Sequence, residues 1–188
     1  MAILPANVLI ADPSSDWMRL AIPLVLTQDL ASSRNLVPTI AVNESSVYQS
    51  GSAETIRTTV QKHSDGLNVQ AAIANVATQR TKQVFGTRSS SSSLLPLLDS
   101  LARQIDRQSI SFSTRNDRAL EAFAVGLSSS DGQLKVQRFR DAIAADPSFG
   151  LAYIALTETL AGANSPEAAA VLRDAVAHRD TFTRTDKA

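Results

Sequence analysis

Two histidines, His63 and His178, and a run of serines at 89–93 are the residues of this sequence best suited to acid–base and nucleophilic chemistry. A hydrolytic triad needs a histidine beside a serine and a carboxylate, because the imidazole must take the hydroxyl proton. The histidines lie far apart along the chain, and no serine occupies a Gly-x-Ser-x-Gly turn. We therefore expect two surface histidines. We interpret the serine run as a loop that ends in a helix cap, with a phosphorylation site as the alternative.

Phosphate, metal and thiol chemistry find no support in the sequence either. It contains neither a Gly-x-Gly-x-x-Gly nor a Walker pattern, and it has no cysteine. Asp12 and Asp16 lie on either side of a predicted helix start, so we interpret their carboxylates as helix-capping groups and not as a catalytic pair. Asp65-Gly66 predicts a hairpin turn and lacks the alternating oxygen ligands of a calcium loop. We expect no enzymatic activity, no cofactor and no bound metal.

The composition is that of a folded globular chain with balanced charge. Apolar residues make up 44% of the sequence and charged residues 19%, which is too apolar for a disordered protein. The 18 basic residues balance 18 acidic ones without a long basic run, so we expect no nucleic-acid partner. No run approaches the roughly 18 apolar residues of a membrane span, so none is predicted.

The sequence leaves the compartment open. Its first residues, "MAILPANVLIADPSSDW", lack the basic region of a signal peptide. The absence of cysteine fits either the cytoplasm or the bacterial envelope. The alternatives are the bacterial periplasm or cell envelope, if a leader has been removed, and otherwise the cytoplasm.

The first half of the chain has the pattern of a strand, a helix and a second strand. Residues 3–10 predict a strand interrupted by Pro5. Residues 17–33 predict a largely buried helix, with a kink or a late start at Pro23 because proline lacks a backbone donor. Residues 35–42 predict the second strand.

A β-meander and a closing helix follow. A period of two predicts strands over 56–60 and 67–73, and Asp65-Gly66 between them predicts a two-residue hairpin loop. The alternating residues are Ile56, Thr58 and Val60, then Leu67, Val69, Ala71 and Ile73. A third strand is expected around residues 83–88, and leucines at helical spacing over 94–105 predict a helix that docks on the sheet. The fold class expected for residues 1–110 is therefore an α+β or α/β layered domain.

Beyond Asp117 the strand signals end and a repeat with an offset of 33 residues begins. The pairs at this offset are Leu120 with Tyr153, Phe123 with Leu156, Leu127 with Leu160, Phe139 with Leu172, Ala142 with Ala175, and Ile143 with Val176. Similarity at a fixed offset is typical of helical repeats, which bury their apolar faces by stacking on their neighbours. Residues 115–180 therefore predict two helical hairpins, followed by a tail at 181–188.

This segment resembles the tetratricopeptide repeat. Phe139, Ala142 and Pro147 match the second half of that pattern, while the first helices match loosely. Both repeats are one residue short between their helices, Lys135 replaces an alanine, and Asp180 replaces the second proline. The resemblance implies a concave groove, formed by the first helix of each repeat, that holds a segment of another protein. The groove residues that it implies are Arg118, Glu121, Val125, Leu151, Ile154 and Glu158.

Residues 3–107 are similar to the amino-terminal domain of TolB-like envelope proteins. The likeness lies in "ILPANVLIADPSSDWMRLAIPLVLTQDLASSRNLVPTIAV", with its strand, helix and second strand, and in "LNVQAAIANVATQRTKQVFGTR", with its strand, turn and strand. It rests on pattern and includes no invariant chemical motif. In many bacterial chains this domain is followed by tetratricopeptide repeats, which is the order implied here.

The function expected is that of a non-enzymatic interaction or scaffolding protein. The alternative is a ligand-binding or sensing α/β domain whose helices serve for attachment or oligomerisation. Only two repeats are present, fewer than usually form a stable array. Either the first domain caps them, the protein forms a homodimer, or the chain is part of a longer one.

Overall fold

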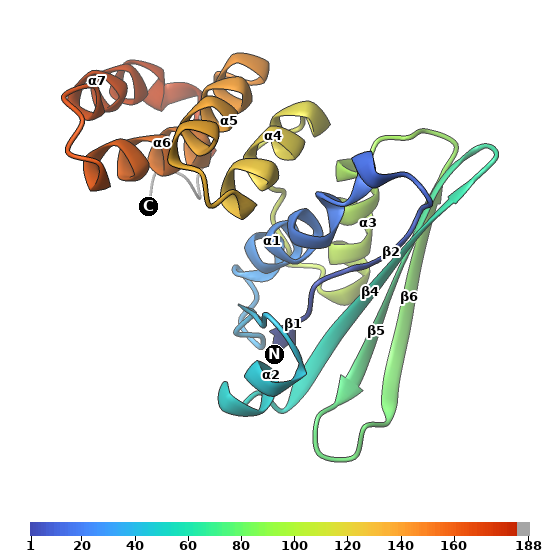
Figure 1. The fold of residues 1–188 in the computed structure, drawn as a ribbon. Helices are drawn as coiled ribbons and strands as arrows, with labels where there is room; N and C mark the ends of the chain where they lie inside the picture. Colours follow the sequence, from blue (N-terminus) through green and yellow to red (C-terminus); the bar gives the residue numbers. More distant parts are fainter. Residues whose placement is uncertain (184–188) are drawn as a thin grey trace. The chain divides into compact units, whose positions relative to one another are not determined.

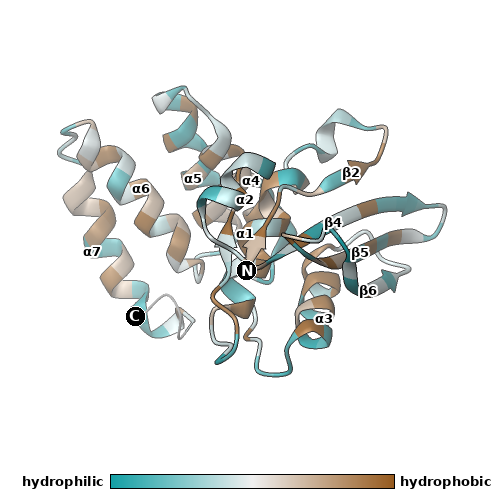
Figure 2. Ribbon diagram, turned by 90° about the horizontal axis from the view of Figure 1, so that it is seen from below, coloured by the Kyte–Doolittle hydropathy of each residue, from teal (hydrophilic) through white to brown (hydrophobic). Residues whose placement is uncertain are grey.

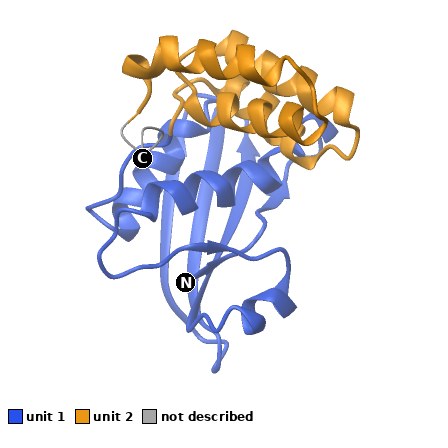
Figure 3. Ribbon diagram, turned by 90° about the vertical axis from the view of Figure 1, so that its left-hand side faces the viewer, with its two compact units in different colours: residues 1–112 blue, residues 113–188 orange. Residues whose placement is uncertain are grey.

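A computed structural model describes residues 1–183 of the chain. The chain divides into two compact units, Met1–Phe112 and Ser113–Ala188 (Figure 3). The predicted domains were 1–110 and 115–180. Of the predicted tail at 181–188, residues 184–188 lie outside the described residues.

The first unit contains a mixed sheet of six strands (Figure 1). The strands are β1 (Ala2–Ile3), β2 (Asn7–Leu9), β3 (Thr39–Ile40), β4 (Glu54–His63), β5 (Gly66–Asn75) and β6 (Thr81–Ser89). Their order is β3-β1-β4-β5-β6, and β2 also pairs with β4. Strand β1 pairs in parallel with β3 and β4, and β2 pairs in parallel with β4, whereas β4, β5 and β6 form an antiparallel meander.

Two helices, α1 (Met18–Leu30) and α3 (Leu95–Ile105), cover one face of the sheet (Figure 1). Hydrophobic residues alternate with hydrophilic ones along β4 and β5 (Figure 2), so that one side of each strand enters the core. In this core the paired residues Val60 and Val69 are fully buried, as are Leu26 of α1 and Leu98 of α3. This mixed α/β sheet with packed helices agrees with the predicted layered fold class.

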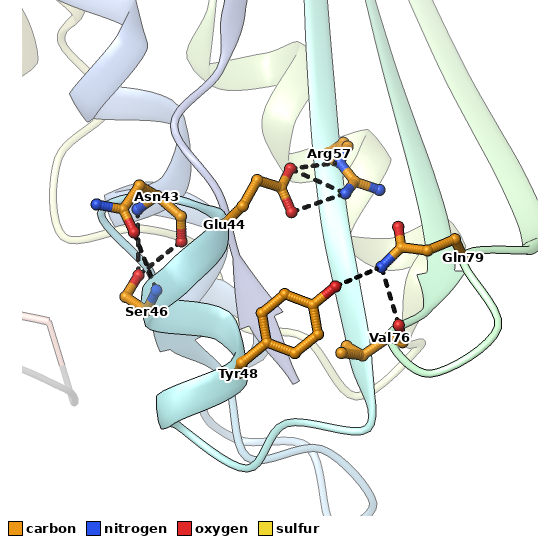
Figure 4. Close-up of polar contacts among 7 residues, drawn as sticks. All are labelled: Asn43, Glu44, Ser46, Tyr48, Arg57, Val76 and Gln79. Atoms are coloured by element: carbon orange, nitrogen blue, oxygen red, sulfur yellow. Dashed lines mark hydrogen bonds and ion pairs between the residues drawn. The ribbon is translucent and has the colours of Figure 1, made fainter.

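A short helix, α2 (Glu44–Gln49), packs on a small cluster made of Ala2, Leu4, Ala41 and Val47. Asn43 and Ser46 cap its first turn reciprocally (Figure 4). Glu44 accepts hydrogen bonds of 2.9 Å from Arg57 of β4 on both carboxylate oxygens, and the Tyr48 hydroxyl accepts one of 3.1 Å from Gln79 (Figure 4). The helix is therefore joined to the meander at both of its ends.

Two prolines explain how the first strand and the first helix differ from expectation. The strand predicted at 3–10 is split into β1 and β2, because Pro5 has no backbone donor for the ladder with β4. Helix α1 starts at Met18 with Pro23 inside it, so the predicted late start is wrong. Pro23 leaves the Arg19 carbonyl without its helical donor, and the Ala6 N–H donates to that carbonyl at 3.1 Å.

Two further expectations need correction. The strand predicted at 35–42 is only the two residues of β3, and it is preceded by Pro38. In the β4–β5 hairpin Gly66 pairs with His63, so the two-residue loop is Ser64-Asp65 and not Asp65-Gly66. Gly66 starts β5 with a φ of 148°, a conformation open to glycine because it has no Cβ.

The second unit consists of four helices and a final 3₁₀ turn at Arg179–Thr181. The helices are α4 (Asp117–Ser128), α5 (Gly132–Ala145), α6 (Gly150–Gly162) and α7 (Ala168–His178), which follow one another as two hairpins (Figure 1). The side chains of Asn116 and Asp131 accept hydrogen bonds from backbone N–H groups in the first turns of α4 and α5. Over residues 1–183, no helix combines the length and the hydropathy needed to cross a bilayer.

Candidate functional site

The six residues predicted to form a groove lie on α4 and α6, and we call this set the α4/α6 face. Each helix contributes residues at positions i, i+3 and i+7, a spacing that places them on one side of a helix. On α4, Arg118 and Glu121 are exposed and Val125 is half-buried. On α6, Leu151 is half-buried, whereas Ile154, which is 45% exposed, and Glu158 are open to solvent.

Three phenylalanines hold the helices that carry this face. The ring of Phe123 on α4 lies 5.6 Å from that of Phe139 on α5 and 4.9 Å from that of Phe149, the residue before α6. Helix α4 approaches α5 closely at Gly126, where a Cβ atom would lie 2.6 Å from the Phe139 ring. The aromatic cluster therefore fixes α4, α5 and the start of α6 relative to one another.

A polar network also joins the start of α4 to the turn between α5 and α6. The Asn116 side-chain amide donates to the Ala145 carbonyl at 2.8 Å, and the Asn116 backbone N–H donates to the Thr114 hydroxyl at 3.0 Å. Asp146 accepts hydrogen bonds from the Thr114 hydroxyl and from the backbone N–H of Ser148, the latter at 2.9 Å. Burial opposes ionisation of Asp146, but the hydrogen bonds from Ser148 and Thr114 outweigh it, and the pKa is lowered.

Replacing Asp146 with alanine is expected to lower the free energy of unfolding of the helical unit by about 1–3 kcal/mol at pH 7, because a charged acceptor is lost. Since the folded pKa is lowered, this stabilisation is present above the ordinary carboxylate pKa of about 3.9 and is lost as the pH falls through the folded value. Urea denaturation should therefore show the gap between wild type and variant narrowing below about pH 4.

The control for this prediction is Asp141→Ala on α5. It removes only a partly exposed ion pair with Arg138 and a hydrogen bond from Gln137, so a loss of less than about 1 kcal/mol is expected. Equal losses for the two variants, or a gap for Asp146→Ala that is independent of pH, would contradict the role given to the network.

The two hairpins differ in what covers their second helix. Phe139 of α5 is 1% exposed, whereas its counterpart Leu172 on α7 is 55% exposed. Helix α5 packs against both α4 and α6, while α7 packs against α6 and the final turn.

The ring of Tyr153 lies 5.5 Å from that of Phe182. Burial and the Asp174 carboxylate raise the pKa of Tyr153.

The helical unit contains a hollow that was not predicted from the sequence. It has a volume of about 770 Å³ and is lined by α5, the end of α6 and the start of α7, including Gln133, Val136 and Leu160. Arg140 and Glu167, which also line it, form an ion pair. None of the six residues of the α4/α6 face lines this hollow. The α5 residues that line it share one helical face, but the sequence does not show which residues of α6 and α7 lie against that face.

A second hollow, of about 380 Å³, lies in the first unit where the chain bends at Pro5. Asn7, Asn43, Arg57 and Thr59 supply polar groups to its wall. Thr58, which also lines it, is buried, and its hydroxyl has no hydrogen-bond partner among residues 1–183. This is the feature of the first unit best suited to a small polar ligand.

The two histidines lie in different units. His63 is exposed at the end of β4. His178 is half-buried, with Nδ1 3.4 Å from an Asp174 carboxylate oxygen and its ring 5.9 Å from that of Tyr153. Among residues 1–183 no serine or threonine hydroxyl hydrogen-bonds to either imidazole, and no three acidic or histidine side chains are grouped as metal ligands. The absence of enzymatic activity stays a prediction.

No family model matches this chain, and no curated protein matches it. Among solved structures, TolB from Acinetobacter baumannii is similar over 57% of this chain and 26% of its own, with 12% identity and a TM-score of 0.32. The chain thus spans about a quarter of that structure's length. A TM-score this low does not establish a shared fold, so the likeness carries no argument about function.

Proposed function

We propose that this protein is a non-enzymatic interaction or scaffolding protein that binds a segment of another protein through the α4/α6 face. The observation that supports this most is the equivalence of the two helices, which carry half-buried or exposed side chains at identical spacing. Within residues 1–183 the charged ends of Arg118, Glu121 and Glu158 form no hydrogen bond or ion pair. They are therefore available to a partner.

In this proposal the two hairpins are tetratricopeptide-like repeats that follow a TolB-like amino-terminal domain in a bacterial protein. The burial of Phe139 and Ala142 and the position of Pro147 in the turn after α5 fit the repeat pattern. The exposure of Leu172 departs from it. The repeat assignment thus has more support in the first hairpin than in the second.

The chemistry of the face defines the kind of segment that it would bind. Val125, Leu151 and Ile154 offer apolar contacts, and the same face also carries two carboxylates and one guanidinium. An apolar side chain flanked by at least one basic residue is complementary to this arrangement, because charge complementarity at the rim favours encounter and register. The expected partner segment is therefore apolar at its centre and basic at its margin.

The proposal is tested by capturing partners from lysate with immobilised protein and comparing wild type with Ile154→Asp. Burying a new carboxylate at the centre of the interface should weaken capture about tenfold or more. The matched control is Leu134→Asp on α5, where a leucine that is 41% exposed lies outside the face. Val125 is not used, because it is half-buried and its replacement would disturb packing. Unchanged capture by Ile154→Asp would remove the face from consideration.

The alternative function is ligand binding or sensing by the first unit, with the helices used for attachment or oligomerisation. The hollow at Pro5, whose wall includes the polar residues Asn7, Asn43 and Thr59, is the observation that favours it. A thermal-shift screen of the full chain against polar metabolites separates the two functions, since a ligand that binds the folded state raises the melting temperature with its concentration. Loss of that shift in Thr59→Val would assign the ligand to this hollow.

A further inference from the structure

The outer edge of β3 is an open sheet edge. Within residues 1–183, strand β3 pairs only with β1. Its backbone donors are Thr39, which donates to the Met1 carbonyl at 3.0 Å, and the following Ala41, which donates to the Ile3 carbonyl at 2.9 Å. Because successive residues of a strand point their backbone groups to alternate sides, those of Pro38, Ile40 and Val42 point away from the sheet. The Ile40 and Val42 N–H groups and the Pro38 and Ile40 carbonyls are thus directed outward.

This edge is apolar as well as open. Ile40 is 49% exposed and Val42 is 75% exposed. By strand register Ile40 lies in one row with Ile3, Ile56 and Ile73. The core face of the sheet therefore ends at this edge in a half-exposed isoleucine. No charged residue occurs from 36 to 43. Sheet edges of this kind pair with another strand unless charges, bulges or a covering element prevent it.

The opposite edge of the sheet, β6, is protected in these ways. Lys82 and Arg88 place charges on it, where Lys82 pairs with Glu54 and Arg88 donates to Asp65 at 2.9 Å. The Gly86 carbonyl accepts a hydrogen bond of 3.3 Å from the side chain of Gln104 on α3. Strand β3 carries no charged side chain, but it is only two residues long and Pro38 precedes it, which limits any pairing to the few residues around Ile40.

We propose that β3 pairs with β3 of a second copy of this chain, antiparallel and centred on Ile40, to form a homodimer with one continuous sheet. With Ile40 opposite Ile40 of the second copy, each N–H donates to the other's carbonyl. Each Val42 N–H then reaches the Pro38 carbonyl of the other copy. Pro38 has no N–H, so the hydrogen bonds that it would donate to the Val42 carbonyls are missing. The outward N–H groups of Ile40 and Val42 all have an acceptor in the other copy.

The self-complementarity of this edge favours a second copy over a foreign strand. A twofold axis through Ile40 places isoleucine beside isoleucine, Val42 beside Pro38 and Ala41 beside Thr39, so that no charged side chains meet. Because the segment is uncharged, two copies face each other without like-charge repulsion. The dimer is independent of the α4/α6 face, and its failure would leave the proposed function untouched.

Sedimentation of the full chain over a range of concentrations tests the dimer. Wild type is expected to sediment as a dimer that dissociates on dilution, and Val42→Lys is expected to raise the dissociation constant about tenfold or more. Val84→Lys is the matched control, since Val84 is 64% exposed on β6, and it should leave the dimer unchanged. Circular dichroism confirms that the variants are folded. A wild type that is monomeric at every concentration, or equal effects of the two lysines, overturns the proposal.

Cross-linking supplies a second readout, because the chain has no cysteine. A short bis-maleimide is expected to join two copies of the Ile40→Cys variant and not two copies of Val84→Cys. Cross-linking from position 84 alone would place the contact on β6 and contradict the proposal. A monomeric wild type that captures a different protein through Ile40 would assign the edge to a partner strand and exclude the second copy.

Discussion

Replacing Phe139 with alanine is expected to lower the free energy of unfolding of the helical unit by about 3–5 kcal/mol, the range for deleting a buried aromatic side chain. Phe139 packs against Phe123 and fills the close approach of α4 and α5 at Gly126. Its loss leaves a cavity that the neighbouring rings cannot fill without moving both helices. Urea denaturation followed by circular dichroism measures the loss.

The matched control is Leu172→Ala, the same position one repeat later. Leu172 is more than half exposed, so its truncation should cost less than about 1 kcal/mol. Hydrogen exchange should show faster opening of α4, α5 and α6 in Phe139→Ala only. Similar losses for the two variants would mean that the two hairpins are equally packed, contrary to the burial described above.

Replacing Gly66 with alanine is expected to destabilise the first unit by about 2–4 kcal/mol, from backbone strain and overpacking together. The φ of 148° is unfavourable for a residue with a Cβ. That Cβ would also lie 2.0 Å from the backbone oxygen of Ser89 on β6, an atom that a side-chain rotation cannot move away. The β4–β5 hairpin or its register with β6 must therefore shift.

Gly132→Ala serves as the control for this variant. Gly132 is the first residue of α5, and a Cβ there meets nothing within 4 Å. Alanine favours helix over glycine by up to about 1 kcal/mol, so this change should be neutral or stabilising. The measurement is the melting temperature of each variant by thermal unfolding, compared with that of the wild type. If Gly66→Ala melts at the wild-type temperature, the described hairpin geometry is wrong.

The parts of the fold that could be predicted from the sequence are those with a long and regular period. Buried and more exposed residues alternate over 56–61 in β4 and over 66–73 in β5, and a one-residue slip would expose the whole core face. Helix α3 repeats its leucines at helical spacing. Such patterns determine an element without knowledge of its neighbours.

The parts that could not be predicted depend on neighbours distant in sequence. The strand divides at Pro5, and the Ala6 N–H beside the break donates to the carbonyl of Arg19 in α1, which Pro23 leaves without its helical donor. Leu172 and Phe139 occupy equivalent positions, yet only Phe139 is covered, because a further helix packs on α5. Periodicity identifies an apolar face but not whether another element covers it.

The candidate functional residues also include some that could be predicted from the sequence and some that could not. The residues of the α4/α6 face were named through the resemblance to the tetratricopeptide repeat, which implies groove positions on the first helix of each repeat, and their role stays a prediction. The hollow beside Arg140 could not be predicted, because α5, α6 and α7 each contribute a few side chains to it. A surface on one face of a helix is visible in a sequence, whereas a cavity between three helices is not.

Photocross-linking tests the central claim, that the α4/α6 face binds a protein segment, more directly than capture does. A photoreactive amino acid replaces Ile154 on the face in one variant and Leu134 on α5 in another, and each full-length protein is irradiated with the captured partner. We predict partner adducts from position 154 and few or none from position 134. Adducts from position 134 alone would place the contact on another surface and contradict the proposed function.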